Sequence, residues 1–244
     1  MTSLLRTYPR RALSWTILLG AVGLGVAALA QQAPPKKAPE TPQPKQEHAE
    51  PKLAAKAPAL PAVTGDARQV ARAKRAFLDV AWVLKSPRCM NCHPAGDRPL
   101  QTDTSRPHAM NISRRSVKNG LQCSACHQTR NAQTLKGQPA GPPGAPHWGL
   151  PPEDTPMIFQ GKRPDEICAQ MRDPAQNGKK TLAQLVEHVD KDPLVLWGWS
   201  PGGDRTKPPM THKAFVDSFK LWAGAGGPCP DASLTVKQAP AYTP

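Results

Sequence analysis

Hydrophobic residues recur at the spacing of an α-helix in four stretches of the chain, and no stretch alternates convincingly as a β-strand would. The stretches are 66–85, a short one that begins at Pro164, 181–190 and 211–224. The apolar side chains expected on their inner faces are Val70, Phe77, Ala81, Leu84, Ile167, Cys168, Met171, Leu182, Leu185, Val186, Val189, Phe215, Phe219 and Trp222. The pattern therefore predicts a mainly α-helical fold with extensive irregular loops.

Local signals fix several helix ends and one long connection. The first pattern stops at Ser86-Pro87, directly before Cys89, and Pro164 suits the first turn of a helix. Thr211 is a residue type that caps helix N-termini. Residues 137–157 are rich in Gly and Pro and predict a long loop, a kind of segment that is usually functional or disordered.

The N-terminal segment resembles an export signal. Three arginines precede an apolar run over residues 13–30 that ends in Ala28-Leu29-Ala30, so residues 1–30 are predicted to be a secretory signal peptide. The run is near the short limit for a membrane span, and an uncleaved anchor that tethers the protein to a membrane is the alternative. Either form predicts an exported, periplasmic protein.

Composition divides the rest of the chain. Residues 31–64 are rich in Pro, Ala and Lys and predict a linker stiffened by proline. Residues 65–232 are enough for one domain, and residues 233–244 predict a flexible tail.

The net charge of +14 would suit nucleic acid or an acidic protein. The export signal and the lack of a basic-aromatic motif argue against nucleic acid.

Two pentapeptides carry the strongest chemical signal. "CMNCH" at 89–93 (the first motif) recurs as "CSACH" at 123–127 (the second motif). C-x-x-C-H is the attachment signature of c-type haem, in which two thiols bond the porphyrin and the histidine faces the iron. The sequence therefore predicts two covalently attached haem c groups, held by Cys89, Cys92, Cys123 and Cys126, with His93 and His127 as the proximal iron ligands.

C-x-x-C pairs also occur in other kinds of site. C-x-x-C pairs also bind structural zinc, but the 30 residues between Cys92 and Cys123 exceed common zinc spacings, and zinc leaves both histidines unexplained. Disulfides are favoured by export. A redox-active C-x-x-C pair would need a thioredoxin-like βαβ pattern, which does not surround either motif. The two remaining cysteines, Cys168 and Cys229, are predicted to form a disulfide.

The ligand on the far side of each iron is harder to assign. Met and His are the usual distal ligands of c-type haem. His108 ranks first because it lies in a short span between the two motifs. For the second iron, His188 is preferred narrowly over Met157, with His212 behind, and Met110 is a further weak alternative. An iron without a distal ligand would be open to catalysis.

The chain also resembles a known family. "CMNCHPAGDRPLQ" and "ICAQMRDPAQNGKKTL", together with "HVDKDPLVLWGWSPGGDRTKPPMTH" and "FKLWAGAGGPCP", are similar to small exported bacterial proteins labelled isoquinoline 1-oxidoreductase subunits. The resemblance covers roughly residues 77–230 and implies partnership with a molybdenum hydroxylase. Nothing in this chain resembles a molybdopterin site or an iron–sulfur module, so a cytochrome subunit that removes electrons is expected.

Three functions follow from these observations. The first is a periplasmic dihaem c-type cytochrome with a cytochrome c-like domain, which transfers electrons from a dehydrogenase, such as a molybdenum hydroxylase, towards the respiratory chain. The second is a dihaem peroxidase-like enzyme with one open iron site. The third is a secreted module without haem, held together by zinc or disulfides.

Overall fold

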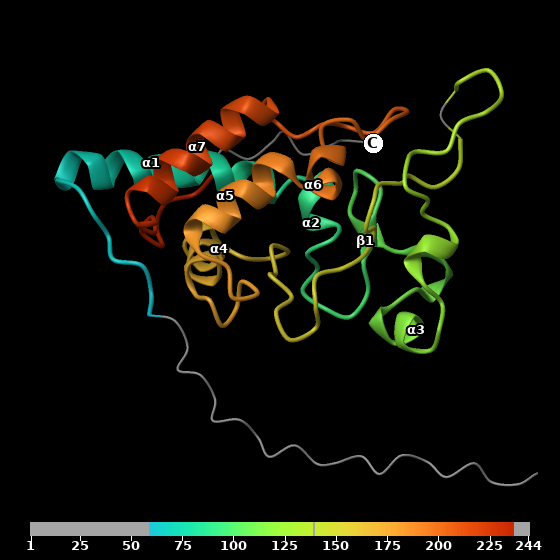
Figure 1. Cartoon of the computed structure of the whole chain (residues 1–244), viewed down its shortest axis with the longest axis horizontal. Helices are drawn as coiled ribbons and strands as arrows, with labels where there is room; N and C mark the ends of the chain where they lie inside the picture. The colour runs from blue at the N-terminus through green and yellow to red at the C-terminus, as the bar shows by residue number, and fades with distance from the viewer. Residues whose placement is uncertain (1–58, 139, 237–244) are drawn as a thin grey trace, which may run out of the picture. The chain divides into compact units, whose positions relative to one another are not determined.

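The computed structural model describes residues 59–138 and 140–236, and there the protein is mainly helical with long irregular segments (Figure 1). The helices are α1 (Ala67–Leu84), α2 (Pro87–Met90), α3 (Arg114–Lys118), α4 (Pro164–Arg172), α5 (Leu182–Lys191), α6 (Pro193–Trp197) and α7 (His212–Gly224). Two 3₁₀ turns, η1 (Ala109–Asn111) and η2 (Cys123–Ala125), and one antiparallel strand pair, β1 (Leu100–Gln101) and β2 (Arg106–Pro107), complete the order.

The four predicted helices correspond to α1, α4, α5 and α7. Helices α2, α3 and α6 and the strand pair were not predicted, because elements of five residues or fewer are too short to show a period. The predicted signal peptide or anchor, most of the predicted linker and residues 237–244 of the predicted tail lie outside the described residues. Within the described ranges, no helix combines the length and hydrophobicity that crossing a membrane would require.

Side chains in the sequence account for where these helices begin. The Asp66 carboxylate accepts hydrogen bonds from two backbone amides of α1, and Gln69 completes a capping box there. Thr181 caps α5 in the same way, and Thr211 caps α7 as predicted. Pro164 occupies the first turn of α4, where its missing N–H costs no hydrogen bond.

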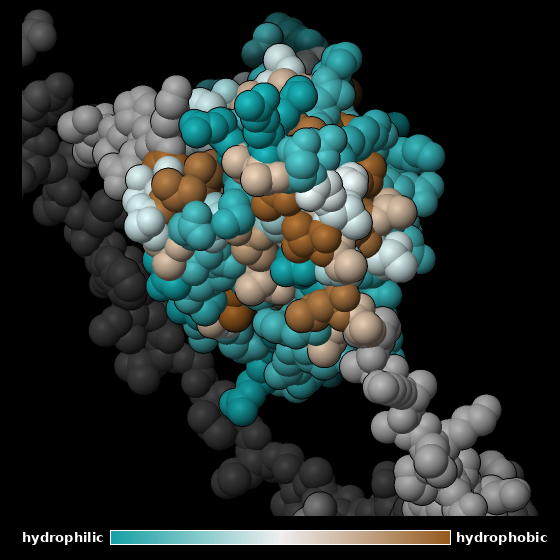
Figure 2. Space-filling view, turned by 90° about the vertical axis from the view of Figure 1, so that its left-hand side faces the viewer, coloured by the Kyte–Doolittle hydropathy of each residue, from teal (hydrophilic) through white to brown (hydrophobic). Residues whose placement is uncertain are grey.

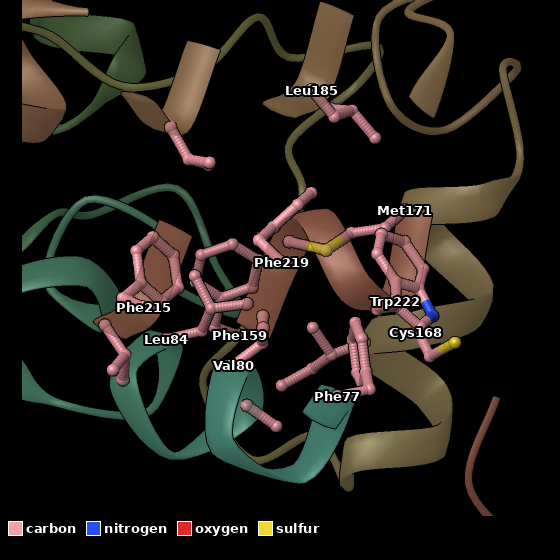
Figure 3. Close-up of a cluster of buried hydrophobic side chains, with 14 of the residues drawn as sticks. Phe77, Val80, Leu84, Phe159, Cys168, Met171, Leu185, Phe215, Phe219 and Trp222 are labelled. Atoms are coloured by element: carbon pink, nitrogen blue, oxygen red, sulfur yellow. The ribbon is translucent and has the colours of Figure 1, made fainter. Parts of the chain in front are cut away.

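The core lies where α7 packs against α1 and α5, with α4 closing it against α1 (Figure 3). Trp222 is fully buried, with ring centroids 4.8 Å from Phe77 and 5.2 Å from Phe219. The predicted inner-face residues are buried except Val70, Leu182 and Val186, which are partly buried. On the face shown in Figure 2, hydrophobic residues form small clusters among hydrophilic ones, as is ordinary for a protein surface.

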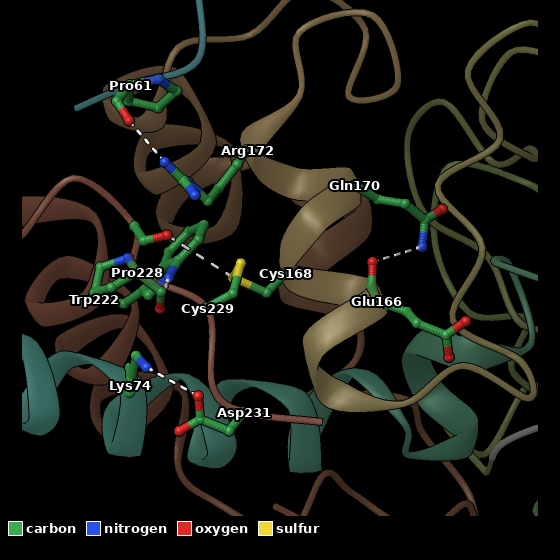
Figure 4. The surroundings of a disulfide bond; sticks show 11 residues. Pro61, Lys74, Glu166, Cys168, Gln170, Arg172, Trp222, Pro228, Cys229 and Asp231 are labelled. Carbon is green, nitrogen blue, oxygen red and sulfur yellow. Dashed lines mark hydrogen bonds and ion pairs between the residues drawn. A yellow bond between two sulfur atoms is a disulfide. The ribbon is translucent and has the colours of Figure 1, made fainter. Parts of the chain in front are cut away.

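Cys168 and Cys229, the predicted pair, form a disulfide that joins α4 to the chain just after α7 (Figure 4). Neighbouring contacts hold the same junction. The Trp222 indole donates to the Pro228 carbonyl at 3.2 Å, and the Lys74 ammonium pairs with Asp231 at 3.2 Å. The bond therefore fixes the C-terminal segment against the core.

Removing this disulfide is expected to destabilise the fold. The two cysteines are 61 residues apart, and closing a loop of that length is worth about 4 kcal/mol in the chain-entropy model. A Cys168→Ala/Cys229→Ala variant should therefore lose about 4 kcal/mol of unfolding free energy in urea denaturation. An unchanged urea midpoint would contradict the stabilising role.

Candidate functional site

The first motif begins inside α2, which follows α1 after a single turn. Helix α1 ends at Leu84, Ser86 precedes α2, and Pro87 starts it, so the core helix delivers Cys89 and Cys92 directly. Cys89 packs against the hydrophobic core. The second motif lies in η2 and is more exposed, with Cys126 open to solvent. All four motif cysteines are free thiols.

The thiols of the first motif are partly buried. Desolvation raises the pKa of Cys89 to about 12 and that of Cys92 to about 11. The pKa of Cys92 is raised further by the charge of Cys123, a residue of the second motif. Such an interaction requires proximity, so the two motifs are neighbours in space.

His93 is held in one defined orientation and tautomer. Its Nδ1 lies 2.6 Å from the Met157 carbonyl oxygen, and a carbonyl can only accept, so Nδ1 carries the proton and Nε2 the free lone pair. Its ring stacks on Phe159, with centroids 4.0 Å apart. Desolvation lowers the pKa of His93 to about 4. The imidazole is therefore neutral at pH 7, the form that binds a metal.

His127 has the same arrangement with different partners. Its Nδ1 donates to the Pro143 carbonyl at 2.7 Å, and its ring stacks on Trp148, with centroids 4.5 Å apart and planes 5° from parallel. Burial lowers the pKa of His127, so this imidazole too is biased to the neutral form. Metal-binding histidines almost always donate their other ring N–H to a carbonyl or carboxylate. Both motif histidines satisfy that condition.

The long loop predicted over 137–157 supplies most of this support. Pro143, Trp148 and Met157 belong to it, and Phe159 follows directly. The backbone amides of Phe159 and Gln160 also donate to the His93 carbonyl, at 3.0 and 3.2 Å. The loop therefore fixes both motif histidines, which gives an irregular segment of this length a physical role.

His108 lies opposite the second motif. Its ring centroid is 6.0 Å from that of His127, with an interplanar angle of 63°. Metal–nitrogen bonds of about 2 Å would separate two ring centroids on opposite sides of one ion by about 6 Å. The Nδ1 of His108 donates to the Ala109 carbonyl at 2.8 Å, which leaves its Nε2 available. His108 and His127 are therefore near enough that both could bind one metal ion.

His188, on α5, accompanies the first motif. It lies near enough to His93 for its charge to contribute to the lowered pKa of His93, after the larger effect of desolvation. The Nδ1 of His188 lies 3.3 Å from an Asp192 carboxylate oxygen, which again leaves Nε2 available. A carboxylate behind an imidazole is a common support for a metal-binding histidine.

The three weaker distal candidates have other surroundings. The Nε2 of His212 donates to the Val189 carbonyl at 2.8 Å and so joins α7 to α5. Met157 packs against the hydrophobic core, and its carbonyl lies on the Nδ1 side of His93, away from Nε2. The Met110 side chain is 81% exposed.

A buried cation lies beside the first motif and was not singled out from the sequence. The Arg88 side chain is 3% exposed, pairs with Asp103 and lies over Trp197, 5.8 Å from the ring centroid. Asp103 is itself held by the Thr206 amide at 2.9 Å and the Thr206 hydroxyl at 2.6 Å. Arg88 therefore places a fixed positive charge next to Cys89.

Aromatic rings connect this cation to the second motif. Trp197 meets Trp148 edge to face at a centroid distance of 4.8 Å, and Trp148 stacks on His127. The Trp197 indole donates to the Asn131 side chain at 2.8 Å, which fixes its orientation. The surroundings of the two motifs are thus one packed unit.

The donor set fits haem better than zinc. Among residues 59–138 and 140–236, no three His, Cys, Asp or Glu side chains converge as a metal-binding group. Each C-x-x-C pair instead precedes an oriented histidine with a free Nε2, as covalent haem attachment requires. Comparison with models of known families, with curated proteins and with solved structures gives no match.

Proposed function

We propose that this protein is an exported dihaem c-type cytochrome that transfers electrons between redox proteins. The observation that carries the proposal is the matched support of the two motif histidines. Each has its Nδ1 proton bound to a loop carbonyl and an aromatic ring stacked on its face. Cys89 and Cys92 would hold one haem, and Cys123 and Cys126 the other.

Each haem iron, when bound, can take up or release one electron. The chain would hold the two groups close together, because Arg88 beside the first motif lies over Trp197, Trp197 contacts Trp148, and Trp148 stacks on His127. His93 and His127 would bind the two irons with neutral imidazoles. The aromatic rings and the 137–157 loop would exclude water and keep these ligands in place.

The distal side favours electron transfer over catalysis. A peroxidase-like enzyme needs one iron without a second protein ligand, so that substrate can bind. Here the ring centroid of His108 lies 6.0 Å from that of His127, and the charge of His188 contributes to the lowered pKa of His93, which supports a second protein ligand for each iron. We therefore propose His108 as the distal ligand of the second-motif haem and His188 as that of the first-motif haem.

The proposed location is the periplasm. The signal-like residues 1–30 support it, and the Cys168–Cys229 disulfide is typical of an oxidising compartment. The resemblance to isoquinoline 1-oxidoreductase subunits suggests a molybdenum hydroxylase as the electron donor. Electrons would then pass towards the respiratory chain.

Arg88 is expected to raise the reduction potential of the first-motif haem. Its buried positive charge opposes the ferric state, which carries one more positive charge than the ferrous state. Arg88→Ala should lower one of the two potentials by tens of millivolts in a spectroelectrochemical titration, an effect on the order of 1 kcal/mol. Arg88→Lys, which keeps the charge, should restore most of the shift. Equal potentials in wild type and Arg88→Ala would contradict this role.

The proposed function is tested by maturing the full chain in a host competent for haem c attachment. Intact mass and the pyridine haemochrome spectrum should show two haems bound through thioether bonds. A chain recovered without covalent haem would overturn the proposal.

A further inference from the structure

The positive charge of the described chain is concentrated around the second motif. Residues 104–152 contain six Lys and Arg and no Asp or Glu, whereas in residues 153–236 ten Lys and Arg face eleven Asp and Glu. The six cations are Arg106, Arg114, Arg115, Lys118, Arg130 and Lys136. Residues 59–103 contain seven Lys and Arg and four Asp and Glu, so the segment around the second motif carries the largest net positive charge of the three.

Ion pairing sharpens the contrast. On α5 and α7 the exposed cations are neutralised by carboxylates, as in the pairs Lys191–Glu187 and Lys213–Asp217. Around the second motif, only Lys118 has such a partner, Glu153. Arg106, Arg115, Arg130 and Lys136 are exposed and form no ion pair with any residue in the described ranges. The positive electric field of these four side chains can therefore attract a negatively charged partner.

The same region is where the second motif reaches the surface. Ser124, Ala125 and Cys126 are exposed, while Cys89 of the first motif packs against the core. Helix α3 adjoins the motif, since Lys118 and Cys123 line one pocket of about 340 Å³ and the Gln122 side chain donates to the Val117 carbonyl at 3.3 Å. We call this surface the second-motif face, made of Arg115, Leu121, Ser124, Ala125, Cys126 and Arg130.

Its composition is that of a transient docking site. Leu121 is 45% exposed and lies in sequence between the cation of α3 and the motif. Apolar contact at the centre with charge at the rim is the usual organisation of protein interfaces. Complementary charge mainly accelerates encounter and orients the partner, which suits a brief electron transfer.

We propose that the second-motif face is the docking surface for an acidic redox protein, and that electrons enter or leave this chain through the second motif. This inference rests on the proposed haem function. In such a transfer, the partner would lose one electron and a haem held by the second motif would gain it, so one group would be oxidised as the other is reduced. The first motif, which is less exposed than the second, would exchange electrons with the second motif rather than with the partner.

The test uses flavodoxin, a small acidic flavoprotein, as the probe. Its reduced form should reduce the oxidised, matured full-length protein in a stopped-flow experiment. At about 10 mM ionic strength, where the Debye length is about 30 Å, Arg115→Glu/Arg130→Glu should lower the second-order rate constant at least about tenfold. At about 1 M salt, the variant and wild type should agree within about twofold.

The matched control is Arg72→Glu/Arg75→Glu, which makes the same change of net charge on exposed positions of α1. It should change the rate less than about twofold at low salt. As a binding readout, flavodoxin titrated into labelled protein should shift amide NMR signals within residues 105–136 and not those of α1 or α7.

Two outcomes would contradict the proposal that the second-motif face is a docking surface. One is an equal loss of rate in the α1 control, which would make net charge the cause. The other is a set of NMR shifts centred elsewhere on the domain. A protein without covalent haem would instead give no reducible absorption band, and this overturns the proposed function before any variant is compared.

Discussion

Replacing both cysteines of the first motif is expected to remove one haem and destabilise the fold, whereas the same change in the second motif should remove only the haem. Cys89 packs against the hydrophobic core, so a haem attached there would be part of it. No residue of 105–136 belongs to that core cluster. Loss of the first haem should therefore cost at least about 3 kcal/mol of unfolding free energy, since fully burying even one large apolar side chain is worth about 1.5–3 kcal/mol.

The two variants, Cys89→Ser/Cys92→Ser and Cys123→Ser/Cys126→Ser, control for each other because they make identical chemical changes. Mass spectrometry should find one haem on each. Urea denaturation should show a loss below about 1 kcal/mol for the second-motif variant. Equal destabilisation of the two would contradict the placement of the first haem against the core.

Removing a distal histidine is expected to convert one iron of the two from low spin to high spin. Both His108 and His188 have their Nδ1 nitrogens bound and their Nε2 nitrogens available, so each should complete the coordination of one iron. His108→Ala and His188→Ala should each give a new high-spin signal in the optical and electron paramagnetic resonance spectra, from different haems. The double variant should have no low-spin iron bound by two histidines.

The control for this experiment is His212→Ala. Its Nε2 is already bonded to the Val189 carbonyl, so its loss should change stability and leave both iron spectra as in wild type. A high-spin signal from His212→Ala, with none from His188→Ala, would mean that His212 and not His188 is the distal ligand. A wild-type protein that is already half high spin would instead favour the peroxidase-like alternative.

The sequence predicts the features that depend on local or pairwise signals. Helices α1, α5 and α7 have both a hydrophobic period and a capping side chain, at Asp66, Thr181 and Thr211. The disulfide was predictable because Cys168 and Cys229 are the pair left over once the two motifs are recognised. These inferences need no knowledge of the packing.

The surroundings of the motifs could not be predicted in the same way. The acceptors for His93 and His127 are backbone carbonyls, which every residue has, so Met157 and Pro143 carry no distinguishing mark. Trp148 lies in a loop without a period, and its contact with His127 depends on how that loop folds. Arg88 resembles any surface arginine until the structure shows it buried.

The distal ligands are an intermediate case. His108 and His188 were ranked highest from the sequence, but which histidine faces which motif depends on long-range packing. His108 lies with its ring centroid 6.0 Å from that of His127, whereas His188 is linked to the first motif only by its effect on the pKa of His93. Met157 was a weaker candidate for the distal ligand, and in the structure its carbonyl accepts a hydrogen bond from Nδ1 of His93.

The central claim is that both C-x-x-C-H motifs hold covalent haem. The most direct measurement is the intact mass of the wild-type protein matured with haem c attachment, recorded after denaturation has removed any haem that is not covalently bound. We expect the mass of the mature chain plus two haems, and peptide mapping should locate them at residues 89–93 and 123–127. A mass with no added haem, or with zinc bound to the four motif cysteines in the native protein, would contradict it.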